Sequence, residues 1–514
     1  MTSSVAAARP ADESGRAAAS ITRRPFARLP VGLVAAAVAA LLAATAPAYG
    51  YHRDELYFRV LGRHPAWGYV DQPPGTPLLT RAATAVFGDS VWGLRVPAVL
   101  AAVAVAVLLA LVAREVGAGA LGQTLAACGV AGTVGLLFGH VLITASVDLV
   151  VWLTVLLCVL RAALRAQPRW WLAAGLAVGV GLWFKLLIGL LVAALVLAVL
   201  AVGPRSLLRS RWCWAGAALA LAVGAPNLVY QVANDFPQLT MAEALRQHKG
   251  AEARTLLLPF QLVTVGLPLL PVVVAGLVAA WRRPALRPIR ALVPGYALML
   301  VALLVLAAQP YYTAGLVLAL HAVGSLPAEQ WIDRVARRRR LVTAAVALNA
   351  VAATAFALPV FPLSVQERLG LAAADQVTRD QIGWPRYVRQ VADVWAALSS
   401  ADRAHAVLIT GNYGEYGAID RYGARYGLPV DRLYSGQNEL HRLAVPPGDT
   451  TVVVLFGLGE DGGVVATWFG SCRIAARLDH GLDIDNEEQG RPVAVCRRPM
   501  ASLPVLWPRF LHYD

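Results

Sequence analysis

The chain is dominated by a series of apolar runs, of a length suited to transmembrane helices, between positions 29 and 361. A helix needs about 20 mostly apolar residues to cross about 30 Å of hydrocarbon. The composition agrees, because 58% of the 514 residues are hydrophobic and only 15% are charged, which is too apolar for a soluble protein of this size. We therefore predict an α-helical polytopic membrane protein. The eleven predicted spans are 29–49, 91–113, 118–138, 143–164, 170–184, 186–203, 212–231, 256–280, 290–308, 311–326 and 341–361.

Arginine residues set the predicted orientation of these spans. The formal net charge of +14 would suggest a nucleic-acid partner in a soluble chain, but the arginines here gather in short loops such as 282–290 and 334–340. Positive residues are enriched in cytoplasmic loops, and the arginine-rich loops of this chain all fall on one side. Arg23, Arg24 and Arg28 precede the first run and place the N-terminus on that side. We predict a multi-pass protein of the plasma or inner membrane that binds the bilayer and no nucleic acid.

The N-terminal region combines a polar tail with the first apolar run. Residues 1–28 are rich in Ala, Ser and Arg and are predicted to be a disordered cytoplasmic tail. The 29–49 run ends in alanines that resemble a signal-peptide cleavage site. Because the run is long and further spans follow, we interpret it as an uncleaved first helix. Residues 29–362 then form a transmembrane domain whose first external loop, 50–82, is the candidate catalytic loop.

After residue 362 the composition changes to that of a soluble domain. Segments 406–411 and 451–456 resemble buried strands, and about 150 residues can bury a core of their own. The topology places residues 363–514 outside the cytoplasm, so we predict an extracytoplasmic α/β domain. Cys472 and Cys496 could form a disulfide there, because such compartments are oxidising.

The first external loop holds the densest polar cluster between two spans. Asp54 and Glu55 are adjacent, so on a helix their side chains diverge by about 100° and only one can face a substrate atom. The alternative is a solvated acidic pair that complements the helix dipole. Aromatic residues such as Tyr57 and Trp67 favour a segment along the membrane interface. The Gln-Pro-Pro-Gly turn at 72–75 then returns the chain to the bilayer.

The order of these motifs resembles the family 39 glycosyltransferases of the GT-C fold, which include protein O-mannosyltransferases and lipid A 4-amino-arabinose transferases. The similarity rests on the acidic pair, on Asp-x-Pro-Pro at 71–74, and on segments 143–152, 226–237 and 309–312. The C-terminal motifs GNYGEYG and DIDNEEQG resemble a bacterial branch of this family. The resemblance implies a GT-C fold and sugar transfer from a polyprenyl-phosphate donor to a hydroxyl acceptor, with inversion at the anomeric carbon.

The resemblance also implies roles for individual residues. Asp54 corresponds to the general base, and Glu55 to an orienting residue beside it. The chain departs from some relatives at Gln72, where they carry Lys or His, so the cation for the donor phosphate must lie elsewhere. Lys185 interrupts an apolar run at the external face and is the first candidate, and the alternative is a lysine that only extends its ammonium to water. The residues predicted to bind donor or acceptor are Asp71, Gln72, Arg53, Arg81, Asp148, Lys185, His248, Lys249, Tyr311 and Tyr312.

Three acidic or imidazole side chains could bind a divalent cation, the one cofactor that the sequence leaves open. These are Asp71, Asp148 and His248. An acid inside a membrane span usually faces a cavity, which supports a role for Asp148 in shaping the acceptor pocket. His248 and Lys249 have a simple alternative, because a solvated polar helix would also place them outside the bilayer.

Two C-terminal motifs are predicted to be structural. The segment 411–418 follows a strand and begins a helix, but it lacks the G-x-G-x-x-G spacing and a P-loop lysine. A tight strand-to-helix turn is therefore predicted there. The acidic residues at 479–488 do not follow the EF-hand spacing, so a solvated loop is predicted in place of a calcium site.

The function predicted is a glycosyltransferase acting at the external membrane face, on a protein, lipid or cell-envelope glycan. The alternative is a secondary transporter or flippase for a lipid or small solute. Transporters place polar residues near mid-membrane in repeated halves, and the sequence contains no internal repeat. A third alternative is a receptor or scaffold with a degenerate site, against which the retained acidic pair argues.

Overall fold

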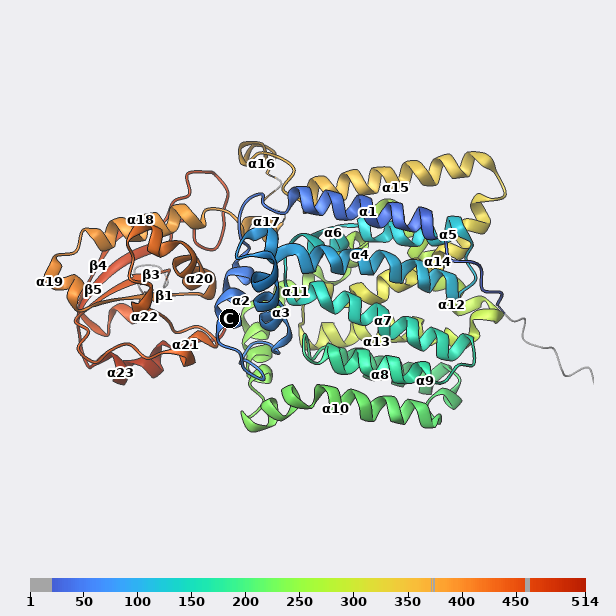
Figure 1. Cartoon of the computed structure of the whole chain (residues 1–514), viewed down its shortest axis with the longest axis horizontal. Coiled ribbons are helices and arrows are strands. Elements are labelled where there is room, and N and C mark those ends of the chain that lie inside the picture. The colour runs from blue at the N-terminus through green and yellow to red at the C-terminus, as the bar shows by residue number, and fades with distance from the viewer. Residues whose placement is uncertain (1–20, 371, 373–374, 458–462) are drawn as a thin grey trace, which may run out of the picture.

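The computed structural model describes residues 21–370, 372, 375–457 and 463–514. A helical part and a C-terminal sheet domain lie at opposite ends of the long axis, with α2 (Arg53–Arg63) and α3 (Gly75–Phe87) between them (Figure 1). Most of the predicted N-terminal tail, residues 1–20, lies outside the described residues. The catalytic loop predicted from the sequence is therefore the layer that joins the two parts.

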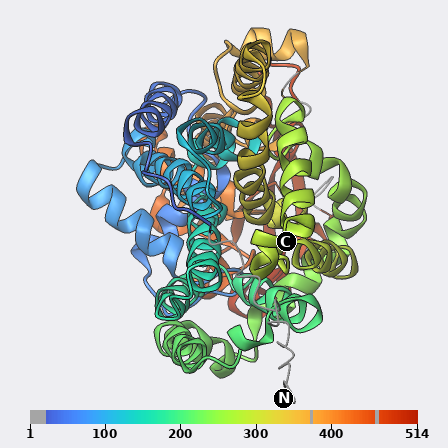
Figure 2. The same cartoon turned by 90° about the vertical axis from the view of Figure 1, so that its right-hand side faces the viewer.

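The helical part contains the membrane-spanning segments, which run side by side along the long axis and are seen end-on in Figure 2. Within the described ranges, six helices are long and apolar enough to cross a membrane, and two bent pairs raise the number to eight. The chain is thus a multi-pass membrane protein, and the count of eleven spans stays a prediction. The six are α1 (Arg28–Thr45), α4 (Val91–Glu115), α7 (Thr144–Leu164), α10 (Arg211–Ala233), the stretch Pro284–Leu306 and α15 (Ala336–Ala357).

Two of the predicted spans are broken helices. The predicted 118–138 span is formed by α5 (Ala120–Ala127), a 3₁₀ turn and α6 (Thr133–His140), which bend by 58°. The predicted 256–280 span joins the end of α11 (Pro237–Val263) to α12 (Leu270–Arg282) with a bend of 63°. Residues 237–254, which lie between the predicted spans 212–231 and 256–280, therefore form the first part of α11.

The predicted break between the spans 170–184 and 186–203, near Lys185, is confirmed. Helix α8 (Trp170–Gly181) ends before it and α9 (Ile188–Val202) begins after it, so Lys185 lies in the turn between two short apolar helices. The remaining helices of this part are α13 (Leu292–Leu306), within the stretch named above, and α14 (Ala314–Ile332), which follows the 3₁₀ turn η5 (Pro310–Thr313).

Glycines allow very close packing between these helices. A Cβ atom at Gly175 of α8 would lie 2.0 Å from the carbonyl oxygen of Gly216 in α10. A Cβ atom at Gly324 of α14 would lie 1.8 Å from the Val272 carbonyl oxygen in α12. Small residues at helix contacts let backbones approach in lipid, where there is little hydrophobic force between apolar helices.

The α2–α3 hairpin is buried between the helical part and the C-terminal domain. Tyr57 and Phe58 are 2% and 3% exposed and pack with Leu440 of the C-terminal domain, whereas Trp67 is 62% exposed. The prediction that the aromatic residues of this loop lie along the membrane interface is therefore wrong for Tyr57 and Phe58. The sequence could not reveal that a second domain covers them.

The C-terminal domain is built on a five-stranded sheet of order β2-β1-β3-β5-β4. Strand β1 (Ala406–Thr410) is parallel to β2 (Leu433–Ser435) and β3 (Val452–Phe456), and β5 (Pro492–Pro499) is antiparallel to β3 and β4 (Phe469–Arg477). The apolar strands β1 and β3 are buried along their whole length, as the continuous runs of Val, Ile and Leu predict. The predicted α/β character is confirmed.

Helices cover this sheet, and a disulfide joins two of its strands. The longer helices are α18 (Trp384–Ala396) and α20 (Tyr413–Tyr422), which contact each other. Cys472 and Cys496 face each other across β4 and β5 and form a disulfide. The short helices are α16 (Leu363–Leu369), α17 (Gln376–Arg379), α19 (Ser400–Ala404), α21 (Leu440–Leu443), α22 (Gly463–Ala466) and α23 (Leu503–Leu506).

Candidate active site

Glu55 is a buried structural anchor of the first external loop. Its carboxylate accepts from Arg95 Nε at 2.9 Å and Nη2 at 2.8 Å, and from the Leu142 backbone N–H at 3.0 Å. It also accepts from the backbone N–H of His52 at 2.8 Å, which completes a capping box at the start of α2. Glu55 is therefore 0% exposed and accepts four hydrogen bonds, so its carboxylate is enclosed by the protein.

Asp54, one residue earlier, faces the C-terminal domain. The Tyr413 hydroxyl donates to Asp54 Oδ1 at 3.0 Å, and the Asp54 backbone N–H donates to His52 Nδ1 at 3.2 Å. Asp54 is partly exposed whereas Glu55 is not. The acidic pair thus divides between a carboxylate that can meet a substrate and one that cannot.

Arg53 joins the same loop to a second acidic element of the C-terminal domain. Its guanidinium pairs with Glu487 and lies 4.7 Å from the Tyr413 ring centroid. Burial opposes the charge of Arg53, but Tyr413, Asp380 and Glu488 outweigh this effect and raise its pKa. Burial also raises the pKa of Glu488, and Arg53 partly offsets that rise. The solvated loop predicted at 479–488 is therefore wrong for Glu488, which is buried and accepts from Asn412, while Glu487 pairs with Arg53 of α2.

Asp148 and Lys185 meet two tyrosines on the membrane side of the loop. Lys185 Nζ lies 4.1 Å from the Tyr312 ring centroid and 5.0 Å from that of Tyr311. Asp148 accepts from Trp152 Nε1 at 3.0 Å and lies within electrostatic range of Lys185. Tyr311 in turn lies within electrostatic range of both Asp148 and Asp54. Asp54, Asp148 and Lys185, far apart in sequence, therefore all lie within electrostatic range of Tyr311.

The Asp-x-Pro-Pro motif and the start of α3 present buried polar atoms without hydrogen-bond partners among the described residues. These atoms are Asp71 Oδ1, Gln72 Nε2, Thr76 Oγ1 and Thr80 Oγ1. Burial raises the pKa of Asp71 to about 7, and the neighbouring Tyr57 hydroxyl partly offsets the rise. Because unpaired buried polar groups are costly in a folded protein, these atoms are able to bind water or a ligand.

This segment also contacts the turn that carries Lys185. The Gly75 backbone N–H donates to the Trp183 carbonyl oxygen at 2.6 Å. A Cβ atom at Gly75 would lie 2.5 Å from that oxygen, so only glycine fits here. The contact brings Gln72 and Lys185 to the same side of the helical part.

Three predicted cationic or imidazole residues do not join this cluster. Arg81 is exposed on α3 and donates to the Gly62 carbonyl oxygen at 3.5 Å. His248 is exposed on α11, with Nδ1 3.9 Å from Asp514. Lys249 lines a separate cavity.

The cation site suggested by Asp71, Asp148 and His248 is not formed by this arrangement. No group of three or more His, Cys, Asp or Glu side chains in the described part of the chain could hold a metal ion. His248 lies beside Asp514, with Nδ1 3.9 Å from its carboxylate. The residues present therefore do not fit a divalent cation at these positions.

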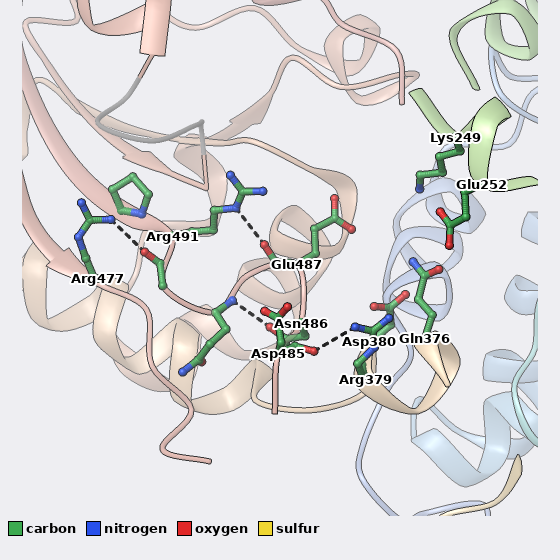
Figure 3. Close-up of a pocket in the computed structure, with 13 residues that line it drawn as sticks. Lys249, Glu252, Gln376, Arg379, Asp380, Arg477, Asp485, Asn486, Glu487 and Arg491 are labelled. Atoms are coloured by element: carbon green, nitrogen blue, oxygen red, sulfur yellow. Dashed lines mark hydrogen bonds between the residues drawn. The ribbon is translucent and has the colours of Figure 1, made fainter. Parts of the chain in front are cut away.

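A polar cavity of about 620 Å³ separates α11 from the C-terminal domain (Figure 3). Lys249 and Glu252 project into it from α11, and Glu487 and Arg491 project from the opposite wall. Its other lining residues are Gln376, Arg379, Asp380, Arg477, Asp485, Asn486, Gln489, Gly490 and Pro492. Glu487 also pairs with Arg53, so its side chain connects this cavity to the residue directly before Asp54.

The GNYGEYGA segment is the strand-to-helix turn that the sequence predicts. The Asn412 side chain accepts from the Glu415 backbone N–H, and Glu415 accepts from the backbone N–H groups of Gly411 and Asn412. Glu415 therefore occupies the helix N-terminus that a phosphate would need. The sequence pattern did not reveal that Tyr413, in this turn, reaches Asp54.

Arg95 is a second residue that the sequence analysis missed. It is 0% exposed and also donates to the carbonyl oxygens of Ala46 and Gly50 and to Gln381 Oε1. A signal was present, because Arg95 is the only charge within the predicted 91–113 span. Charged residues inside membrane spans are costly and need a partner.

Comparisons with known proteins agree with this architecture. Residues 71–230 match the family model described as dolichyl-phosphate-mannose-protein mannosyltransferase. The crystal structure of ArnT from Cupriavidus metallidurans bound to undecaprenyl phosphate is similar over 91% of this chain and 98% of ArnT, with a TM-score of 0.60 and 16% identity. The apo structure of the same ArnT gives a TM-score of 0.59 with 15% identity over the same shares of both chains.

A weaker likeness links the chain to an archaeal oligosaccharyltransferase. AglB from Archaeoglobus fulgidus is 14% identical over 86% of this chain and 72% of AglB, with a TM-score of 0.49. No curated protein sequence matches the chain. Residues 71–230 thus carry the sequence pattern of the dolichyl-phosphate-mannose-protein mannosyltransferases, and the chain as a whole has the GT-C-type fold of ArnT.

Proposed function

We propose that this protein is a glycosyltransferase that moves a sugar from a polyprenyl-phosphate donor to a hydroxyl acceptor. The observation that carries the proposal is that Lys185 Nζ lies 5.0 Å from the Tyr311 ring centroid, with Asp54 and Asp148 both within electrostatic range of the same tyrosine. This arrangement supplies a partly exposed carboxylate, a buried acid and a cation at the end of the membrane helices that faces the C-terminal domain. The match to the mannosyltransferase family and the ArnT structure with bound undecaprenyl phosphate support the same chemistry.

The reaction proposed is a single displacement with inversion at the anomeric carbon. The acceptor oxygen forms a bond to that carbon while the bond from the carbon to the phosphate oxygen breaks. Asp54 takes the proton from the acceptor hydroxyl, and the polyprenyl phosphate leaves with the electron pair. A general base of this kind typically contributes about 10²–10⁴ in rate.

The donor phosphate is assigned to the Lys185 side of the cluster. Lys185 is held over two aromatic rings and has Asp148 nearby, so its ammonium has a fixed position. The unpaired Gln72 amide and the Thr76 and Thr80 hydroxyls add neutral hydrogen-bond donors on the same side. These donors compensate for the lysine or histidine that some relatives carry at the position of Gln72.

The acceptor is assigned to the polar cavity between α11 and the C-terminal domain. Its lining consists mainly of charged and amide side chains, which suit a hydroxylated head group better than a hydrocarbon chain. The contact of Glu487 with Arg53 supports a route from this cavity toward Asp54. A protein, a lipid head group and an envelope glycan all offer the hydroxyl that the reaction requires.

The site is proposed to face outward from the plasma or inner membrane. The arginine-rich loops at 282–290 and 334–340 lie at the other ends of the helices and favour the cytoplasmic side. At the same ends, Arg165 donates to the Glu115 carboxylate and to the Ile21 carbonyl oxygen of the N-terminal segment. The proposed donor carries its sugar already attached to a lipid, so the reaction requires no nucleotide sugar at this face.

The test is sugar transfer in proteoliposomes that contain the purified protein, a panel of radiolabelled undecaprenyl-phosphate monosaccharides and envelope extract from a strain that lacks the protein. We expect label to leave the lipid fraction with wild-type protein and to remain there with Asp54→Asn. Asp393→Asn, a change at an exposed acid on α18, is the matched control and should transfer normally. Movement of intact labelled lipid across the bilayer, with no transfer, would favour the transporter alternative.

A further inference from the structure

The C-terminal domain places a tyrosine inside the candidate active site. Tyr413 begins α20, and its hydroxyl is 3.0 Å from Asp54 Oδ1, although 359 positions separate the two residues. No sequence motif of the membrane part contains this tyrosine, and the family match ends at residue 230. The contact is therefore a feature of this chain's own C-terminal domain.

Several contacts fix the position of the Tyr413 ring. It stacks on Tyr57 of α2, with ring centroids 4.8 Å apart, and lies under the Arg53 guanidinium at 4.7 Å. The Tyr413 backbone N–H donates to Gln437 Oε1 at 2.6 Å. The hydroxyl is thus held against Asp54 by partners on both sides of the domain boundary.

Glycines allow α20 to approach α2 closely enough for this contact. A Cβ atom at Gly414 would lie 3.0 Å from the Arg53 Cβ atom. A Cβ atom at Gly417, one turn later, would lie 2.8 Å from the Leu56 carbonyl oxygen. The two glycines therefore make the helix face that follows Tyr413 flat, and α2 packs directly on it.

We propose that Tyr413 is a positioning residue for the proton-accepting carboxylate of Asp54, which makes the C-terminal domain an essential part of the active site. The inference rests on the proposed function and deepens it. By donating to Oδ1, Tyr413 fixes the rotation of the carboxylate and leaves Oδ2 for the acceptor hydroxyl. The donated hydrogen bond also favours the ionised carboxylate, which is the form that accepts a proton.

Other titratable groups lie around Asp54 and its neighbour Arg53. They come from the loop itself, from η5 and from the C-terminal domain. These groups are His52, Arg53, Asp71, Tyr311, Asp380, Tyr413 and Glu488. Among the described residues, Tyr413 is the group that donates a hydrogen bond directly to the Asp54 carboxylate. Removal of its hydroxyl should therefore change the pH profile of transfer.

The test compares Tyr413→Phe with wild-type protein in the proteoliposome assay, over a range of pH. Phenylalanine keeps the stacking on Tyr57 and Arg53 and removes only the hydroxyl. We expect kcat to fall roughly tenfold, as is typical for the loss of a charge-assisted hydrogen bond. The acid limb of kcat/KM should move to higher pH, while the KM for the lipid donor should change less than about twofold. A purely structural role would lower the amount of active protein without moving the acid limb.

Two further variants test whether the Tyr413 hydroxyl itself acts on Asp54. Tyr426→Phe, a change at a partly buried tyrosine of the same domain, is the matched control and should leave kcat and the pH profile unchanged. Site-specific 3-fluorotyrosine at position 413 strengthens the donated hydrogen bond and preserves the fold, so it should move the acid limb to lower pH. If wild-type protein transfers sugar and neither Tyr413 variant moves the acid limb, the inference is overturned and the proposed function stands. If wild-type protein transfers no sugar, the proposed function fails and the inference fails with it.

Discussion

The Arg95 guanidinium binds both carboxylate oxygens of Glu55, at 2.9 and 2.8 Å, and neither side chain is exposed. This ion pair connects α4 to the start of the first external loop. Arg95 also donates to carbonyl oxygens at the end of α1, so a single side chain fixes three segments. The position of Asp54, the next residue to Glu55, depends on this connection.

Arg95→Met should therefore destabilise the protein strongly. Removing one partner leaves the buried Glu55 charge uncompensated, which typically costs about 3–5 kcal/mol. We expect a clear fall in the thermal unfolding midpoint in detergent, followed by fluorescence size exclusion. Arg81→Met, at an exposed arginine of the neighbouring α3, is the control and should change the midpoint little. The double variant with Glu55→Leu should recover part of the loss, and strict additivity of the two changes would contradict a direct pair.

Lys185→Ala should weaken binding of the lipid donor. The ammonium is the cation held nearest to Asp148 and the two tyrosines, so its loss removes positive charge from the proposed phosphate position. We expect the donor KM to rise about tenfold, the change that a lost charged contact of about 1.4 kcal/mol produces, with kcat less affected. Lys185→Arg should retain part of the affinity.

The control for this change is Arg209→Ala, which removes an exposed cation from the loop between α9 and α10. It should leave the donor KM unchanged. An unaltered donor KM in Lys185→Ala would show that Lys185 does not bind the donor phosphate. The alternative, in which this lysine only extends its ammonium to water, would then hold.

Asp71 should make the stability of the loop depend on pH. Burial raises its pKa from 3.8 to about 7, so the folded protein holds this proton more tightly than the unfolded chain does. Its contribution to stability is therefore largest below about pH 4 and is lost as the pH rises to about 7, by at most about 4 kcal/mol for such a shift. Asp71→Asn should flatten the fall of the unfolding midpoint between about pH 4 and pH 7. Equal slopes for wild-type protein and Asp71→Asn would show that Asp71 ionises freely in the folded state.

Gly417→Val should separate the C-terminal domain from the catalytic loop. A Cβ atom at this position would lie 2.7 Å from the Leu56 Cβ atom and 2.8 Å from its carbonyl carbon, so α20 must move away from α2. We expect transfer to be lost and limited proteolysis to release a C-terminal fragment faster. Gly448→Val, in the same domain but with its nearest neighbour 3.9 Å away, is the matched control. Full transfer by Gly417→Val would show that the contact with α20 is dispensable.

Much of the architecture could be predicted because lipid constrains each segment separately. The apolar runs identified the helices, and the turn at Lys185 and the buried strands β1 and β3 were placed from local pattern alone. The division of the acidic pair followed from helix geometry, because Asp54 and Glu55 cannot face the same atom. The structure agrees, since Glu55 is enclosed and Asp54 is not.

The partners of these residues could not be predicted, because they lie far away along the chain. Tyr57 and Phe58 were expected at the membrane interface, yet a domain more than 300 positions later covers them. Glu487 was expected in solvent and instead pairs with Arg53. Hydropathy describes how a residue interacts with its solvent, and it cannot tell lipid from a second protein surface.

By itself, the sequence determined a membrane protein with a dense polar loop between its first two spans and an α/β domain at its C-terminus. Only the tertiary structure decided that Arg95 anchors the loop and that Tyr413 reaches Asp54 across 359 positions. The physical reason is that burial and periodicity act along a helix, whereas hydrogen bonds and ion pairs depend on which distant segments meet. Those meetings were set by glycines such as Gly417, whose missing side chain allows α20 to pack directly on α2.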